Sequence, residues 1–523
     1  MVATDTMEKT KGEKVATLDD AMLLSGFGVY NVLHMLLCGF ILMGMITQCL
    51  ALGYVLPAAQ CDLQLTLHQR GWITAIPFVA IILTSYFWGW MADTRGRKPV
   101  MLCAMLGSTV FSAFASFAPS VPWFAALQFI SALFMSGSSA VLYTYLGEFH
   151  NLRHRDKMVA FGSSFVGIGT VILPCIAWLI LPQDFAYYIP FLDIHYRPWR
   201  LFVIACAIPF TICTVLLWFA PESPKFLYAN GSTEEALEVV KQIYSANMRK
   251  EKETFPVTAL YVENSTAKTS NTKGAAAVLA SMKEQTFPLF KLPLLPWTCL
   301  TCFVQFGILA ATNGFYVWFP TILNSLASNN GEETKICDVL DANRRAAANS
   351  TDEACDDTIH TSTFERSIYI GLVFCSMYII VGILVDYIGK RIILIVTLIC
   401  TGLAAIGAHL AYNQQLAVIL FAIFQMSGAC IGLMNAVAVE IFPTKLRAMA
   451  ICLSMMMGRV GSMAGTNLIA LFLDINCGAS FYLFGSLIIV NGLFCLTLPK
   501  NKVTESPKPA TVETNQNVSD EAV

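Results

Sequence analysis

Twelve long apolar runs constrain this chain more than any other feature of its sequence. A helix needs about 20 apolar residues to cross the ~30 Å hydrocarbon core of a bilayer. The runs occupy residues 31–56, 71–92, 99–118, 121–147, 158–182, 199–220, 293–324, 366–386, 391–411, 414–440, 447–473 and 480–498. They are too uniformly apolar for the alternating strands of a membrane barrel. We therefore predict an all-α polytopic membrane protein with twelve transmembrane helices.

Charge supports this class and indicates the orientation. Only 13% of the 523 residues are charged, against about 25% in soluble domains. Lysines and arginines concentrate in the segments that face the cytoplasm if both termini do, and fewer fall outside, such as Arg70, Arg197 and Arg200. This bias follows the positive-inside rule and predicts an integral membrane protein, of the plasma membrane or a vesicle, with both termini cytoplasmic. We expect the bilayer, and no nucleic acid, as a partner.

A charged turn after the second run recurs in the second half of the chain. The first copy contains Gly89, Asp93, Arg95, Gly96, Arg97 and Lys98, and the second contains Gly382, Asp386, Gly389, Lys390 and Arg391. A second repeat pairs Glu148 and Arg155 with Glu440 and Arg447. The two repeats have nearly equal offsets, 293 positions from Asp93 to Asp386 and 292 from Glu148 to Glu440. We therefore predict two pseudo-symmetric six-helix bundles.

Polar segments divide the chain further. We predict a cytoplasmic N-terminal segment at 1–30, bundles at 31–220 and 293–499, a cytoplasmic linker at 221–292 and a cytoplasmic tail at 500–523. In the linker, a Ser/Thr start followed by carboxylates favours a surface helix over 232–250. We expect no regular structure from there to residue 273.

The loop at 325–365 contains two cysteines and a glycosylation sequon at Asn349. In the predicted topology it faces an oxidising, glycosylating compartment. Cys61, Cys337, Cys355 and Cys477 all map outside, and four cysteines allow three pairings. We hypothesise a bridge between Cys337 and Cys355.

The repeated turn, together with residues 221–225 directly after the sixth run, resembles the major facilitator superfamily. The segments 199–203, 237–249 and 316–320 look most like the synaptic vesicle glycoprotein 2 family and its organic-ion transporter relatives. The resemblance covers roughly residues 18–499. It implies transport of small solutes by rocking of the two halves, with the charged turns as cytoplasmic gating latches. The alternative for the basic residues of the turns is that they only set topology.

Several positions depart from that family pattern. Where relatives carry acidic groups in spans 1 and 10, this chain has Met45, Gln48 and Asn435, and Gln128 replaces a basic residue of span 4. Proton coupling needs a titratable group within the membrane. We therefore expect a facilitative carrier or an exchanger.

Arg459 is a charge well inside a predicted span. A mid-helix arginine costs about 2.5–3.5 kcal/mol on insertion scales, so it should face protein or water. One interpretation is that it pins span 11 to its neighbours. The other is that it binds an anion, because the corresponding position in the organic-ion transporters that the chain resembles carries a base in anion carriers.

Other candidates for a substrate cavity are polar or aromatic residues in apolar runs. We single out Gln48, Tyr143, Asn313, Tyr316, Trp318 and Asn435. For each of them, hydrogen bonding between helices is at least as good an interpretation as substrate contact.

No phosphate-binding loop, metal-ligand spacing or nucleophile constellation occurs in the sequence. We therefore expect no enzyme activity and no cofactor. The favoured hypothesis is a monomeric transporter of small organic anions or zwitterions. The alternative is a non-transporting membrane protein that keeps the fold and acts through protein partners.

Overall fold

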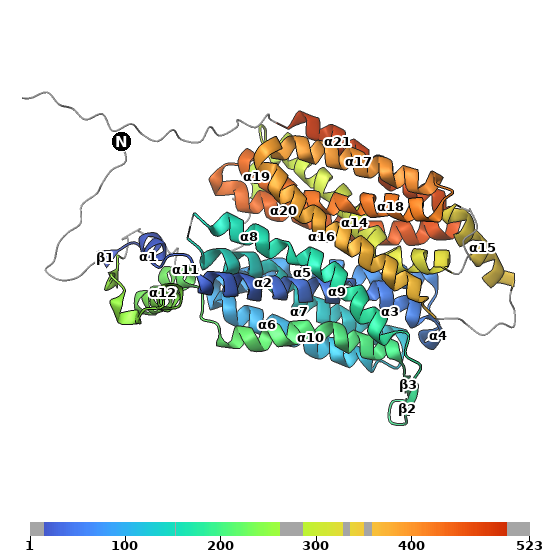
Figure 1. Cartoon of the computed structure of the whole chain (residues 1–523), viewed down its shortest axis with the longest axis horizontal. Helices are drawn as coiled ribbons and strands as arrows, with labels where there is room; N and C mark the ends of the chain where they lie inside the picture. The colour runs from blue at the N-terminus through green and yellow to red at the C-terminus, as the bar shows by residue number, and fades with distance from the viewer. Residues whose placement is uncertain (1–14, 152, 262–285, 328–334, 350–357, 499–523) are drawn as a thin grey trace, which may run out of the picture.

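The computed structural model describes residues 15–151, 153–261, 286–327, 335–349 and 358–498. Two helical bundles lie side by side, one blue to green and the other yellow to red (Figure 1). The first contains α2 (Val29–Leu50), α3 (Leu52–Ala58), α4 (Gln60–Leu63), α5 (Leu67–Arg95), α6 (Arg97–Ser116), α7 (Val121–Glu148), α8 (Arg155–Ser163), α9 (Phe165–Ile180) and α10 (Pro198–Phe219). The second contains α14 (Leu295–Ala327), α16 (Thr361–Ile388), α17 (Lys390–Leu410), α18 (Gln414–Gln425), η3 (Met426–Ala429), α19 (Cys430–Ile441), α20 (Thr444–Ile475) and α21 (Cys477–Phe494). We call them the N-half and the C-half.

Eleven helical segments in the described part of the chain are long and apolar enough to cross a membrane. The twelfth predicted span corresponds to α20, which has 32 residues. This helix contains Arg459 and several glycines. A side chain at Gly461 or Gly465 would collide with the backbone of α14, so small residues allow these two helices to pack closely, as in many membrane bundles.

The charged turns have the same backbone in both halves. Gly96 separates α5 from α6 with φ +106°, and Gly389 separates α16 from α17 with φ +89°. Such φ angles favour glycine because it lacks a Cβ atom. The repeated glycine in the sequence therefore marks a repeated sharp turn between consecutive spans.

The end of the molecule that bears the charged turns also carries a small folded layer. It consists of β1 (Val15–Ala16), α1 (Leu18–Leu24), α11 (Pro224–Ala229), α12 (Thr233–Met248), η1 (Lys252–Thr254) and β4 (Ala259–Leu260). The expected surface helix is present as α12, but its apolar face packs into the N-half core. The expectation of no regular structure after residue 250 is wrong for 252–260, because β4 pairs in parallel with β1. A short η2 (Phe287–Phe290) precedes α14.

The opposite end carries α15 (Ile336–Asn349) and the antiparallel hairpin of β2 (Tyr187–Ile189) and β3 (Ile194–Tyr196) (Figure 1). The short η4 (Cys495–Thr497) follows α21 at the end with the charged turns. We call the end with α15 the outer end and the end with α12 the inner end, in line with the predicted topology. The hypothesised Cys337–Cys355 bridge is wrong: Cys337 is bonded to Cys477, which ties α15 to α21. Cys61 is also disulfide-bonded. Cys355 lies outside the described residues, as does the side chain of Asn349, the last residue of α15.

Candidate functional site

The two halves meet in three main pairs of helices: α3 with α14, α5 with α20 and α9 with α16. Near the outer end these contacts are close. A Cβ on Gly53 would lie 2.8 Å from the carbonyl oxygen of Val317, and one on Gly71 would lie 2.9 Å from Ala470 Cβ. Backbones approach this closely only where small residues face each other.

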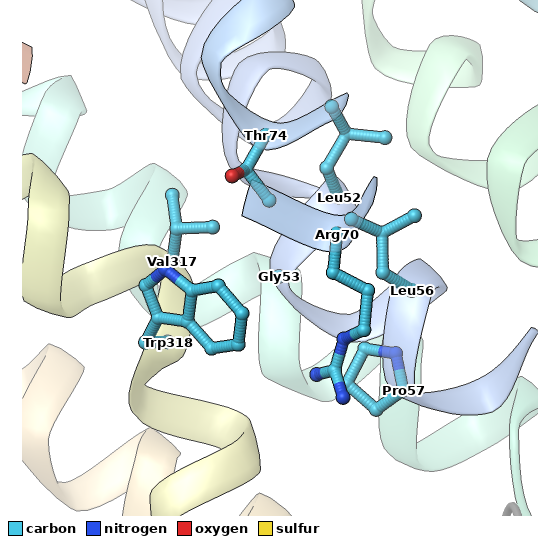
Figure 2. Close-up of a pocket in the computed structure, with 8 residues that line it drawn as sticks. All are labelled: Leu52, Gly53, Leu56, Pro57, Arg70, Thr74, Val317 and Trp318. Carbon is cyan, nitrogen blue, oxygen red and sulfur yellow. The ribbon is translucent and has the colours of Figure 1, made fainter. Parts of the chain in front are cut away.

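Arg70 lies at the centre of this outer contact (Figure 2). Its guanidinium donates to Thr321 Oγ1 of the C-half at 2.6 Å and to Gln60 Oε1 of the N-half at 3.1 Å. Its Cζ also lies 5.2 Å from the centre of the Trp318 ring. Arg70 is 6% exposed and Trp318 is 1% exposed, and the small space that they line with Thr74 and Val317 is too narrow for a water molecule. The outer end is therefore sealed, and we call Arg70, Gln60, Trp318 and Thr321 the outer gate.

Tyr316 of α14, next to the outer gate, also joins the halves. Its hydroxyl donates to the carbonyl oxygen of Thr170 at 3.3 Å, and a Cβ on Gly371 would lie 2.8 Å from the same oxygen. Tyr316 is thus the one predicted cavity residue for which a cross-half hydrogen bond is recorded among the described residues.

At the inner end, Arg97 is the centre of the N-half turn. It pairs with Asp93 at 3.0 Å and with Glu148 at 3.2 Å, and its Nη1 donates to the Ala92 carbonyl oxygen at 2.9 Å. Arg97 and Glu148 are 13% and 10% exposed, whereas Asp93 is 72% exposed. The Glu148 pair is consequently shielded from water and the Asp93 pair is not.

Glu222 completes this cluster from the segment after α10. Its carboxylate accepts from the backbone N–H groups of Arg97 at 3.1 Å and Ser223 at 2.7 Å, and also from Lys98. Ser223 in turn donates to Glu148. Burial raises the pKa of Glu222 above its ordinary value of 4.5, although these N–H donors oppose the shift. We call Asp93, Arg97, Glu148, Glu222 and Ser223 the N-latch.

The corresponding turn of the C-half is simpler. Lys390 pairs with Glu440 at 2.5 Å, and Arg391 donates to the Leu496 carbonyl oxygen. The side chain of Asp386 lies outside the described part of the structure. Arg155 lies against Gly147 within the N-half, and Arg447 is half-buried. Among the described residues, the hydrogen bonds and ion pairs of the two charged turns join residues of the same half. The outer gate, in contrast, has a hydrogen bond that joins the N-half to the C-half.

Most predicted cavity residues bond to neighbours within one half. Gln48 forms a cluster with Ser108 and Ser131. The Asn435 amide oxygen accepts from Gln305 at 2.9 Å, Asn313 donates to Ser462 at 2.9 Å, and the indole of Trp318 donates to the Thr466 carbonyl oxygen at 3.0 Å. These contacts agree with the helix-packing interpretation of those residues.

Arg459 differs from them. It makes no ion pair or hydrogen bond with any residue that the structure describes. Protein surrounds it, and its charge acts on Cys49 of α2 and Tyr143 of α7, both in the opposite half. The side chain nevertheless keeps part of its surface accessible. Tyr143 is 41% exposed. Arg459 and Tyr143 thus lie in opposite halves within electrostatic range of each other, and neither is fully buried.

Sequence reasoning missed two parts of this arrangement. We predicted Arg70 to be a charge of an outside loop, but it lies inside α5 and is only 6% exposed. Glu222 and Ser223 belong to the 221–225 motif, for which the sequence predicts no contact with the charged turn. In both cases the signal was present as a charged residue beside a predicted span end.

Two closely packed helical halves, sealed at one end and carrying equivalent charged turns at the other, define a membrane transporter fold. A family model described as Major Facilitator Superfamily matches residues 36–332 and 367–520. The chain therefore belongs to the Major Facilitator Superfamily, whose members are transporters and not enzymes.

Relatives at the sequence level are distant. The chain is 28% identical to human synaptic vesicle glycoprotein 2A over 246 residues, which is 47% of this chain and 33% of that protein. It is 30% identical to mouse synaptic vesicle glycoprotein 2C over 224 residues, 43% of this chain and 31% of that protein. The match thus spans about a third of the length of these relatives.

Solved structures show the same fold. The partially occluded inward-open form of the E. coli xylose transporter XylE superposes with a TM-score of 0.63 at 15% identity, covering 94% of this chain and 99% of that one. Its inward-open form gives a TM-score of 0.61 at 15% identity, covering 93% and 97%. This likeness concerns the fold alone.

Proposed function

We propose that this protein carries small organic anions or zwitterions across a membrane by alternating access, as a facilitative carrier or an exchanger. The observation that carries the proposal is Arg459. It is a cation in the middle of α20 with no carboxylate partner among the described residues, and its charge reaches Tyr143 of the other half, whose side chain is 41% exposed. A guanidinium binds carboxylates and sulfonates through paired hydrogen bonds, and these are strong where water is scarce.

The contacts between the halves favour an inward-facing state. The outer gate bridges the halves, whereas the N-latch and the Lys390–Glu440 pair bridge helices of one half only. Rocking that opens the outer gate would bring the latch ends together. On this proposal Gly89, Arg95, Lys98 and Gly382 belong to the moving turns, and both termini remain cytoplasmic.

Polar groups near the interface favour an organic ion over a sugar. A sugar needs many free hydrogen-bond partners, but Gln48, Asn313 and Asn435 are already bonded to neighbouring side chains. The non-transporting alternative gains support only from the similarity to synaptic vesicle glycoproteins, which covers less than half of the chain.

An uptake screen in proteoliposomes tests the proposal. Organic anions, cations and neutral solutes are compared with and without a pH gradient. We expect saturable uptake of at least one anion that does not depend on the gradient. Uptake of cations alone, or of nothing above protein-free liposomes, would contradict the proposal, and the second result would favour the alternative.

A further inference from the structure

Arg70 is a buried cation with only neutral partners. Its nitrogens bond to the amide oxygen of Gln60 and the hydroxyl of Thr321, and its Nε has no partner among the described residues. The other buried arginine near the outer end, Arg200, is paired with Asp62 at 3.0 Å. A buried charge is unfavourable unless an opposite charge balances it. Arg70 is thus under-compensated where Arg200 is not.

The partners of Arg70 belong to two different bodies. Gln60 belongs to the N-half with Arg70 itself, whereas Thr321 and Trp318 lie on α14 of the C-half. Figure 2 shows Arg70 and Trp318 at this contact. When the halves separate at the outer end, the C-half partners move away and the guanidinium loses its strongest neutral acceptor. It then faces an opening toward the outside.

We propose that Arg70 is a second anion-binding residue, which takes a carboxylate or sulfonate from the outside when the outer gate opens. This inference rests on the proposed function, because it supplies the entry step for the same class of solute. An anion that pairs with Arg70 in the open gate has no equivalent contact in the sealed one. It therefore binds the outward-open state better and shifts the population toward it.

Opening of the gate can be followed with a cysteine at Thr74, which lines the sealed space and is 4% exposed. The full chain carrying Thr74→Cys is reconstituted with the outer end outward and treated with a membrane-impermeant maleimide. The same chain without Thr74→Cys gives the background from native cysteines. The probe is benzenesulfonate, and uncharged benzenesulfonamide is its matched control.

We expect benzenesulfonate to accelerate labelling at position 74 by about fivefold or more, the usual scale of coupling between ligand and conformation, and benzenesulfonamide to have no effect. Arg70→Gln should abolish the acceleration, and Arg70→Lys should keep part of it. Lys335→Gln removes an outer cation that stacks on Tyr412, away from the gate, and should change nothing. Thr321→Val should raise labelling without any anion, because it removes the cross-half bond.

Equal acceleration in the Arg70→Gln variant, or none in the parent, would overturn the inference. The Arg70→Lys variant keeps the test decisive if Arg70→Gln does not fold. The two proposals are tested separately by Arg459→Gln, which should lose uptake but retain the accelerated labelling. Acceleration without uptake of any organic anion would refute the carrier proposal and leave Arg70 as an anion site.

Discussion

Arg97 in the N-latch permits a prediction whose size follows from the structure. Its pair with Glu148 is shielded, with side chains 13% and 10% exposed, and removing one member of a buried pair typically costs about 3–5 kcal/mol. Its pair with Asp93 involves a carboxylate that is 72% exposed, and such surface pairs contribute about 0.2–1 kcal/mol. Arg97→Gln should therefore destabilise the protein by several times more than Asp93→Asn.

The assay is the thermal stability of the purified protein. It is measured for three single variants, Arg97→Gln, Asp93→Asn and Glu148→Gln, and for the double variants Arg97→Gln/Glu148→Gln and Arg97→Gln/Asp93→Asn. A double-mutant cycle isolates each pairwise interaction. We expect strong coupling between Arg97 and Glu148 and little between Arg97 and Asp93. Equal losses for Arg97→Gln and Asp93→Asn, or additive effects of the Arg97 and Glu148 changes, would refute the assignment of the N-latch to the shielded pair.

Three further predictions concern the disulfide, the N-latch carboxyl and the topology. Cys337→Ser should destabilise the protein by about 2–5 kcal/mol, because the bond to Cys477 closes a separation of 140 residues. Cys355→Ser should leave the disulfide-linked Cys337–Cys477 peptide intact in non-reducing peptide mapping. A linked Cys337–Cys355 peptide would contradict the structure. Because the pKa of Glu222 is raised above 4.5, its contribution to stability should be greatest below about pH 4.5 and decline as the pH rises through the folded pKa. The melting temperature of the wild type relative to Glu222→Gln should fall accordingly, and a difference that does not change with pH would count against the shift. If Asn349 is glycosylated, Asn349→Gln should abolish the mass shift of the protein on glycosidase treatment, whereas Asn230→Gln should not. The opposite result would mean that the predicted topology is inverted.

The spans and the repeated turns could be predicted because length, hydropathy and glycine chemistry act locally. Gly96 and Gly389 occupy a backbone conformation that favours glycine, so their repetition in the sequence already marked two equivalent turns. The apolar runs predicted all twelve spans, and eleven of them are helices in the described part of the chain that are long and apolar enough to cross a membrane. In the twelfth, α20, Gly461 and Gly465 allow close contact with α14.

Partners distant in the sequence could not be predicted in the same way. The pairing of Cys337 with Cys477 depends on how α15 folds back onto α21, and spacing alone favoured the nearer Cys355. Arg70 counted as a loop charge because a hydropathy window cannot place a boundary within one turn of a helix. The hydrogen bond between β1 and β4 likewise joins residues far apart along the chain.

Substrate transport past Arg459 is the central claim, and a charge series at this position tests it most directly. Uptake of the organic anion found in the screen is measured without a pH gradient for the wild type, Arg459→Lys and Arg459→Gln. Asn467→Ala serves as the matched control on α20, because the one hydrogen bond of its side chain among the described residues is to the Met463 carbonyl oxygen of the same helix. We predict that Arg459→Gln abolishes uptake, that Arg459→Lys restores part of it and that the control retains it. Unchanged uptake in Arg459→Gln would contradict the account.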